Sequence, residues 1–343
     1  LIAGKSVMTT MDASASFFTA LPNDLLQRVL VGLPFDDHHA ATGACQAFRG
    51  VITGSRFPAL RQKYGFAERG IVTVRPADRG RQYDVTSRLQ IVMAHKNEIV
   101  ASIPQNEILI SGGSTTDGGS RLFVSTKTPP WDATPNEVLT VDVSSRRWKR
   151  FATLPQKLIG HSIEWHGGLL YVAGGCRDDG PSYILNSFSA FNETTGLWEA
   201  LPPMPIKTLW AASGIIGNQL FIAGGRNGLK ALQIYDIPSR TWRLGPWIPN
   251  SYSRSAQYGG FVVDGKLCLM NVRGSPILVY DPQANTWTEE APRSFTIRLA
   301  CVHDGRLIVY RENSIVIARA NDGSWFPYAH VEPQRHWSYT SVS

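Results

Sequence analysis

Histidine side chains are the residues of this sequence best suited to chemistry, because imidazole binds metal ions and transfers protons near neutral pH. His161 and His166 stand in the stretch "GHSIEWHGG", and His303 stands in "CVHDGR". Copper or iron chemistry would need several such ligands gathered at one place with tyrosine, cysteine or carboxylate partners. Neighbouring glycines and an aspartate instead put these histidines around turns. We therefore interpret them as structural or surface residues and predict no metal ion or other cofactor.

Other catalytic signatures are weak or missing. The stretch "GGSTTDGG" from Gly112 to Gly119 is rich in glycine, but no GK[ST] follows it, so we interpret it as a loop and not as a phosphate-binding site. His38 and His39 lie near the start of a predicted helix, where we expect a structural role. Neither a GxSxG nor an HExxH motif is present. The sequence therefore predicts a protein that is not an enzyme.

Composition limits the partners and the compartment. The formal net charge is +7, but no aromatic-interleaved RNA motif accompanies the basic residues, so we expect no nucleic-acid partner. The sequence has no run of eighteen apolar residues, so we expect no membrane partner. Four widely spaced cysteines favour free thiols in a reducing compartment, and we expect the cytosol, the nucleus or both. These cysteines are Cys45, Cys176, Cys268 and Cys301.

A repeated pattern must position whatever site the chain carries. "LLYVAGG" ends at Gly175 and "QLFIAGG" ends at Gly225, and each is followed by a short second strand, a turn and a tryptophan. Weaker copies lie upstream and downstream. The tryptophans of five copies are separated by 50, 44, 45 and 38 residues, a period that suits a propeller blade of four short strands. They are Trp148, Trp198, Trp242, Trp287 and Trp325.

Each part of the repeat has a physical role. The two glycines permit a backbone conformation and a close approach that a Cβ would obstruct. The tryptophan ring buries a large apolar area and should hold each sheet to its neighbour.

With its glycine pair, a Tyr-Asp such as Tyr235-Asp236 and a spaced tryptophan, the pattern resembles the kelch repeat. The last two copies lack the glycine pair. Counting Ile71 to Pro104 as a copy without its tryptophan, we predict a mainly β, kelch-type propeller of about six blades over residues 71–343, which the tail "HWSYTSVS" could close.

The N-terminal part has a different pattern. We expect a disordered leader over residues 1–18, a first helix from Pro22, a second from about Asp36 to Ile52, and a short linker helix over 61–70. Residues 19–60 resemble an F-box, the adaptor-docking helical module. The matching positions are Leu21, Pro22, Asp24, Leu25, Val29, Leu30, Leu33, Pro34, Cys45, Phe48, Arg49, Ile52 and Phe57.

An F-box followed by kelch repeats is similar to plant substrate receptors of SCF-type ubiquitin ligases. That resemblance implies docking to a Skp-type adaptor, and through it to a cullin, while the propeller binds a target protein for ubiquitination and proteasomal degradation. The implied adaptor-binding residues are Leu21, Pro22, Leu25, Val29, Leu30 and Phe48. As candidate target-binding residues we select Arg177, Trp210, Arg226, Arg273 and Arg298, since arginine and tryptophan are frequent in binding hot spots. The alternatives are a scaffold without a degradative role and a catalytic or metal-binding propeller.

Overall fold

The computed structural model divides into two compact units, which are described separately. One comprises Leu1–Glu68 with Asp142–Arg147, and the other comprises Arg69–Val141 and Trp148–Ser343. The described residues are 23–33, 35–44, 46–52, 54, 56–57, 60–61, 71–75, 88–93, 96–102, 113–117, 121–126, 136–142, 147–177, 183–228, 230–249, 258–271, 277–290, 297–303, 306–311, 315–319 and 325–330. The predicted leader and the tail "HWSYTSVS" lie outside this part, as does all but Arg61 of the predicted linker helix.

The first unit contains three short helices: α2 (Asn23–Val31), α3 (Phe35–Ala44) and α4 (Gln46–Ile52). Two helices thus occupy the segment where we predict one. Thr42 and Gly43 are weak helix formers, and the Arg49 side chain donates from Nε to the Thr42 carbonyl at 3.2 Å, which satisfies a carbonyl near the end of α3. None of the described helices is long and apolar enough to cross a membrane.

These helices share a small core of buried apolar side chains from all three elements, with Phe57 from the segment that follows. A buried arginine, Arg61, donates to the Val31 carbonyl at 2.8 Å and also to the Leu33 carbonyl, so it caps the end of α2. His38 is buried beside it, and its Nε2 lies 3.0 Å from Arg61 Nη1 and 3.1 Å from the Leu33 carbonyl oxygen. His38 therefore has the structural role that we predicted.

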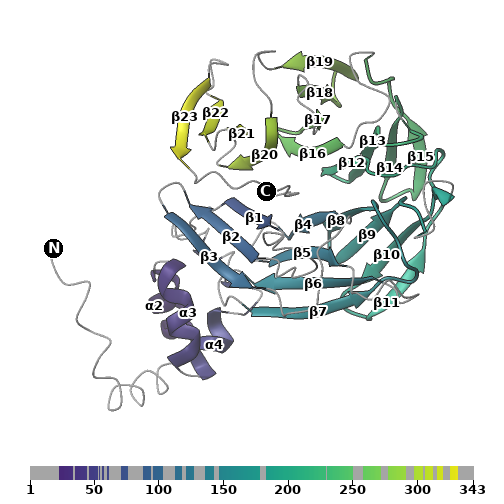
Figure 1. Ribbon diagram of the computed structural model, residues 1–343. Coiled ribbons are helices and arrows are strands. Elements are labelled where there is room, and N and C mark those ends of the chain that lie inside the picture. The colour runs from purple at the N-terminus through teal and green to yellow at the C-terminus, as the bar shows by residue number, and fades with distance from the viewer. Residues whose placement is uncertain are drawn as a thin grey trace, which may run out of the picture. The chain divides into compact units, whose positions relative to one another are not determined.

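The second unit consists of antiparallel sheets whose strands are hydrogen-bonded in chain order, five of them with four strands and one with three in the described residues. Figure 1 shows each sheet as a set of adjacent strands, from the blue strands near residue 71 to the yellow strands near residue 330. The three-stranded sheet is β1 (Ile71–Arg75), β2 (Arg88–Met93) and β3 (Lys96–Ser102).

The four-stranded sheets follow at the predicted period, and their bounds are these. The first contains β4 (Ser114–Thr116), β5 (Arg121–Thr126), β6 (Glu137–Asp142) and β7 (Arg147–Thr153). The second contains β8 (Ser162–His166), β9 (Leu169–Ala173), β10 (Phe188–Asn192) and β11 (Leu197–Ala200). The third contains β12 (Ala212–Ile216), β13 (Gln219–Ala223), β14 (Leu232–Asp236) and β15 (Thr241–Leu244). The fourth contains β16 (Tyr258–Val263), β17 (Lys266–Asn271), β18 (Ile277–Asp281) and β19 (Thr286–Glu290). The fifth contains β20 (Ile297–His303), β21 (Arg306–Arg311), β22 (Ile315–Arg319) and β23 (Trp325–His330).

The first strands of successive sheets lie beside one another. β4 contacts β8, β8 contacts β12, β12 contacts β16, β16 contacts β20, and β20 contacts β1. Such a series of sheets, joined through their first strands, is a β-propeller arrangement. The fold is therefore mainly β with a propeller arrangement, as the repeat predicts. Apolar clusters between neighbouring sheets form its core, for example Phe221, Leu232 and Ile234 packed with Leu267 and Tyr280.

Three of the repeated tryptophans join neighbouring sheets, as predicted. All five lie on the fourth strand of a four-stranded sheet. Three of them donate a hydrogen bond from Nε1 to a backbone carbonyl at the end of the preceding sheet. The bonds run from Trp198 to Thr153 at 2.8 Å, from Trp242 to Pro202 at 2.8 Å, and from Trp287 to Pro246 at 3.1 Å.

Candidate functional site

The loops that follow the glycine pairs lie at the same end of their sheets as the segments leading into the first strands. Gly174 and Gly175 follow β9 directly, with φ of 65° and 89°, and the Gly175 N–H donates to the Thr208 carbonyl at 2.9 Å. A Cβ on Gly175 would lie 2.9 Å from the Ile159 carbonyl oxygen, which explains why glycine is needed there. The glycine pair therefore brings adjacent sheets together at this end, called here the glycine-pair end.

Three of the five predicted target-binding residues lie at the glycine-pair end. Arg177 and Arg226 are exposed, and the segment around Arg226 pairs with Leu209, immediately before Trp210. Trp210 has a φ of 57° and donates its N–H to the Gly160 carbonyl at 2.8 Å. Its ring packs over Gly160, where a Cβ would approach the ring to 2.5 Å. Trp210 is therefore partly committed to packing between sheets.

For the other two predicted target-binding residues, the structure does not describe the side chain. Arg273 lies outside the described residues, and for Arg298 the structure describes only its position on β20. One residue at this end was missed by the sequence analysis. Tyr183 has 53% of its surface exposed, and its carbonyl accepts from the Arg177 N–H at 3.4 Å. An exposed tyrosine beside an exposed arginine is a typical protein-binding combination.

The predicted adaptor-binding residues differ in how they are placed. Leu21 and Pro22 lie outside the described residues, and for Leu25 the structure gives only its place on α2. Leu30 and Phe48 are buried in the core of the helices, with 1% and 8% exposure. Val29 is different, because half of its surface is exposed. Among the described members of the set, Val29 is therefore the one with a large apolar surface available to a partner.

A cavity of about 410 Å³ lies among the first strands of four consecutive sheets and is distinct from the glycine-pair end. Its lining comes from the later residues of β4, β8, β12 and β16 and the turns that follow β8 and β12. Glu164 of β8 lines this cavity and accepts hydrogen bonds from Ser213 Oγ at 2.6 Å and Thr115 Oγ1 at 3.3 Å. Burial raises the Glu164 pKa to about 7, although the two hydroxyl groups lower it in part. The sequence analysis did not identify Glu164.

The histidines singled out from the sequence are separated by the structure. His161 is buried, its Nε2 lies 2.9 Å from Ser125 Oγ, and burial lowers its pKa to about 4. His166 lines the cavity, and His303 lies at the end of β20. Within the described residues, no group of three or more His, Cys, Asp or Glu side chains is arranged to hold a metal ion.

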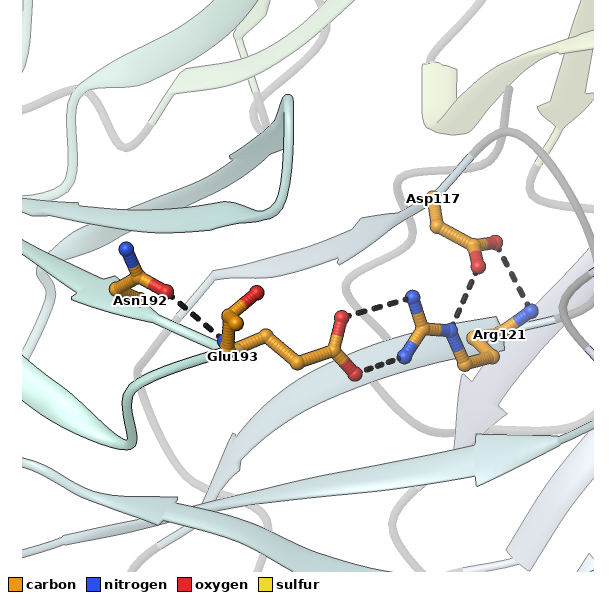
Figure 2. A network of polar contacts seen from close by, with 5 residues as sticks. Asp117, Arg121, Asn192 and Glu193 are labelled. Atoms are coloured by element: carbon orange, nitrogen blue, oxygen red, sulfur yellow. Dashed lines mark hydrogen bonds and ion pairs between the residues drawn. The ribbon is translucent and has the colours of Figure 1, made fainter.

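An ionic network lies next to the cavity and joins two sheets. Figure 2 shows the Arg121 side chain between two carboxylates, Asp117 and Glu193. Arg121 Nε lies 2.7 Å from Asp117 Oδ2 within the sheet, and Arg121 Nη1 lies 2.5 Å from Glu193 Oε1 in the next sheet. The guanidinium carbon also lies 5.1 Å from the centroid of the Trp165 ring. Arg121 is therefore held from three directions, which indicates a structural role at this junction.

Comparisons with known proteins agree with the repeat. Residues 159–205, which include β8 to β11, match the family described as the kelch motif. The chain contains a kelch motif. Kelch repeat and BTB domain-containing protein 12 from Danio rerio is 29% identical over 175 residues, which are 43% of this chain and 28% of that protein. The chain therefore spans just over a quarter of the length of that relative.

A second relative covers more of the chain. The F-box/kelch-repeat protein SKIP20 from Arabidopsis thaliana is 21% identical over 317 residues, which are 83% of this chain and 69% of that protein. Among solved structures, that of YjhT aligns with a TM-score of 0.48 and 16% identity, over 59% of this chain and 72% of that one. The relatives thus include kelch proteins with BTB domains and kelch proteins with an F-box.

Proposed function

We propose that this chain is the substrate-recognition subunit of an SCF-type ubiquitin ligase and performs no catalysis itself. Its helical unit would dock a Skp-type adaptor, and through it a cullin, while its sheets bind a protein target for ubiquitination and degradation. The chain would act by proximity, raising the effective concentration of target lysines near the ubiquitin-transferring enzyme. For this role we expect the protein in the cytosol, the nucleus or both, and the buried Cys176 and Cys268, which form no disulfide, fit a reducing compartment.

The observation that carries the proposal is the exposed Val29 on a helix that buries Leu30 and Val31. Leu30 and Val31 contribute to the core of the helices, so α2 is fixed in place by its own unit. Val29 on the same helix has 50% of its surface exposed. An apolar side chain on a fixed helix can pack against a partner without a large ordering cost. The alignment with an F-box/kelch-repeat protein over most of both chains supports the same role.

The target-binding part of the proposal rests on the glycine-pair end. Arg177, Arg226 and Tyr183 are exposed there on loops held by backbone hydrogen bonds between sheets. Two arginines on a rigid support favour an acidic segment of the target protein. Arg273, Arg298 and the partly packed Trp210 remain candidates for the same surface.

The test of adaptor docking is capture of the tagged full chain from plant cells treated with a proteasome inhibitor, followed by mass spectrometry. We expect Val29→Asp to lose adaptor and cullin peptides, because the substitution places a charge in an apolar contact without disturbing the core. The control is Leu244→Asp, which makes the same change at a 54% exposed leucine on β15 and should retain the adaptor. Equal adaptor recovery with both variants and with a Leu21→Ala/Pro22→Ala double variant would contradict the proposal.

A scaffold role is distinguished by the lifetime of the captured proteins. If the chain is a degradation receptor, proteins retained with Val29→Asp should have longer half-lives when the wild-type chain is removed from cells. Unchanged half-lives with normal adaptor capture would identify a scaffold instead.

A further inference from the structure

The cavity between β4, β8, β12 and β16 contains a carboxylate held in one position. Thr115 of β4, Glu164 of β8 and Ser213 of β12 come from the first strands of three successive sheets, each separated from the next by 49 residues. The two hydroxyl groups donate to different oxygens of Glu164, one from each neighbouring sheet. The carboxylate is therefore fixed before any ligand arrives, which lowers the entropic cost of binding.

The walls of the cavity depend on close contact between sheets. A Cβ on Gly260 of β16 would lie 2.8 Å from the Ser213 backbone, and a Cβ on Gly214 would lie 2.6 Å from Val262 Cγ2. Glycine at both positions lets β12 and β16 approach each other beside Glu164. The volume of about 410 Å³ falls in the range of small-molecule sites.

Charges around the cavity are unbalanced. Its described lining contains two carboxylates, Glu164 and Asp117, and one imidazole, His166, but no lysine or arginine. Asp117 is already paired with Arg121. Glu164 is held by hydroxyl groups, which orient its negative charge and do not neutralise it. A cation entering the cavity would supply the missing charge.

We propose that this cavity binds an organic cation, a guanidinium or primary ammonium group, through a direct ion pair with the Glu164 carboxylate. The planar guanidinium group suits a fixed carboxylate because two parallel N–H groups can donate to its two oxygens. A metal ion is a poorer fit, since Asp117 is already paired with Arg121, and among the described residues no three His, Cys, Asp or Glu side chains are grouped to hold one. This site is independent of adaptor docking and of target binding at the glycine-pair end.

Binding of the cation should depend on pH through Glu164. Burial raises the pKa of this carboxyl to about 7, so the carboxylate form increases between pH 6 and pH 8. The other titratable groups near it are Asp117 after β4, His166 on β8, Tyr171 opposite Glu164 on β9, and Arg121 on β5. Burial raises the Tyr171 pKa above its usual value, so Tyr171 stays neutral in this range. Neither β12 nor the lining part of β16 carries a charged residue.

The probe for the site is methylguanidinium, titrated against the full chain and followed by saturation-transfer NMR. We expect the dissociation constant to be about tenfold smaller at pH 8 than at pH 6, which is the change in the carboxylate fraction for a pKa of about 7. Methylurea, which has a similar shape and no charge, should not bind. Glu164→Gln should abolish binding at both pH values, whereas Glu199→Gln, at an exposed carboxylate paired with Arg240, should leave it unchanged.

A second variant tests which group titrates. Ser213→Ala removes a hydrogen bond that favours the ionised form of Glu164, so the pH midpoint of binding should rise. No binding of methylguanidinium to the wild-type chain at pH 8, or equal binding to Glu164→Gln, would overturn the proposal. An unchanged midpoint in Ser213→Ala would do the same.

The cation could be a small molecule or an arginine side chain of a bound protein. The peptide N-acetyl-Gly-Arg-Gly-amide separates these sources. Tighter binding of the peptide than of methylguanidinium, still dependent on Glu164, supports an arginine from a protein. Weaker binding of the peptide supports a small organic cation.

Discussion

At the scale of single residues, the buried His161 and the half-buried Glu164 make folding depend on pH in opposite directions. Burial lowers the His161 pKa to about 4, so the neutral imidazole favours the folded state above the unfolded pKa near 6.5, and that stability is lost as pH falls toward 4. Burial raises the Glu164 pKa to about 7, so the protonated carboxyl favours the folded state below its usual pKa of 4.5, and that stability is lost as pH rises toward 7.

Replacing Glu164 with Gln should therefore stabilise the protein only where the carboxylate is ionised. At pH 8 we expect Glu164→Gln to raise the free energy of unfolding by on the order of 2 kcal/mol, and at pH 4 by close to zero. Urea unfolding at the two pH values measures this difference. Glu199→Gln replaces an exposed carboxylate, so it should change the free energy of unfolding by less than about 1 kcal/mol at both pH values. A gain for Glu164→Gln that is the same at pH 4 and pH 8 would show that Glu164 ionises in the usual range.

At the scale of the elements, the glycine pair should be much less tolerant of a side chain than the glycines of the hairpin turns. Gly225 has a φ of 81°, and a Cβ there would lie 2.5 Å from Thr208 Oγ1 and 2.7 Å from the Leu209 carbonyl oxygen. Gly217, in the turn after β12, has a φ of 57°, and no described atom lies within 4 Å of its Cβ position. Both alanine variants lose about 1 to 2 kcal/mol for the left-handed backbone.

We expect Gly225→Ala to lose several kcal/mol more than Gly217→Ala, because the segment 208–211 that leads into β12 must move away to admit the methyl group. The midpoints of urea unfolding give the comparison. Similar midpoints for the two variants would mean that the close approach of segment 208–211 to Gly225 is not rigid.

A second prediction at this scale follows from the tryptophan contact between sheets. Trp242→Phe keeps an aromatic ring but removes the Nε1 hydrogen bond to the Pro202 carbonyl, so the free energy of unfolding should fall by about 1 kcal/mol. Trp247 has 71% of its surface exposed, so Trp247→Phe should have almost no effect. If Trp247→Phe lowered the free energy of unfolding more than Trp242→Phe, the joining role assigned here to Trp242 would be wrong.

The elements also show what a sequence can and cannot reveal. Trp198, Trp242 and the glycine pairs recur because several sheets make the same contact with a neighbour, so a periodic search finds the fold and the glycine-pair end. Glu164 is different, because its partners come from two other sheets and lie 49 residues away in each direction. An alignment on the glycine pairs places Gly214, and not Ser213, at the position of Glu164, so the repeat does not mark these three residues as partners.

At the scale of the whole molecule, the two proposed interactions should be separable because they belong to different compact units. We expect Arg177→Glu/Arg226→Glu to lose captured target proteins and to retain the adaptor, the reverse of Val29→Asp. Capture with quantitative mass spectrometry at low and high salt measures both, and an acidic target should also be released by salt. The control is Lys149→Glu/Arg243→Glu, the same charge reversal at exposed residues of β7 and β15. Equal loss of targets from both double variants would show an effect of net charge and not of the glycine-pair end.

The tryptophan contacts have a consequence for the order in which the chain is made. Trp198, Trp242 and Trp287 each donate to a carbonyl that precedes them by 45, 40 and 41 residues. When such a tryptophan leaves the ribosome, its partner has already been synthesised, and the sheet that it completes can dock at once on the one before. Contacts of such short sequence separation form quickly. This part of the protein can therefore assemble sheet by sheet during translation, with little time for an unpaired edge to meet another chain.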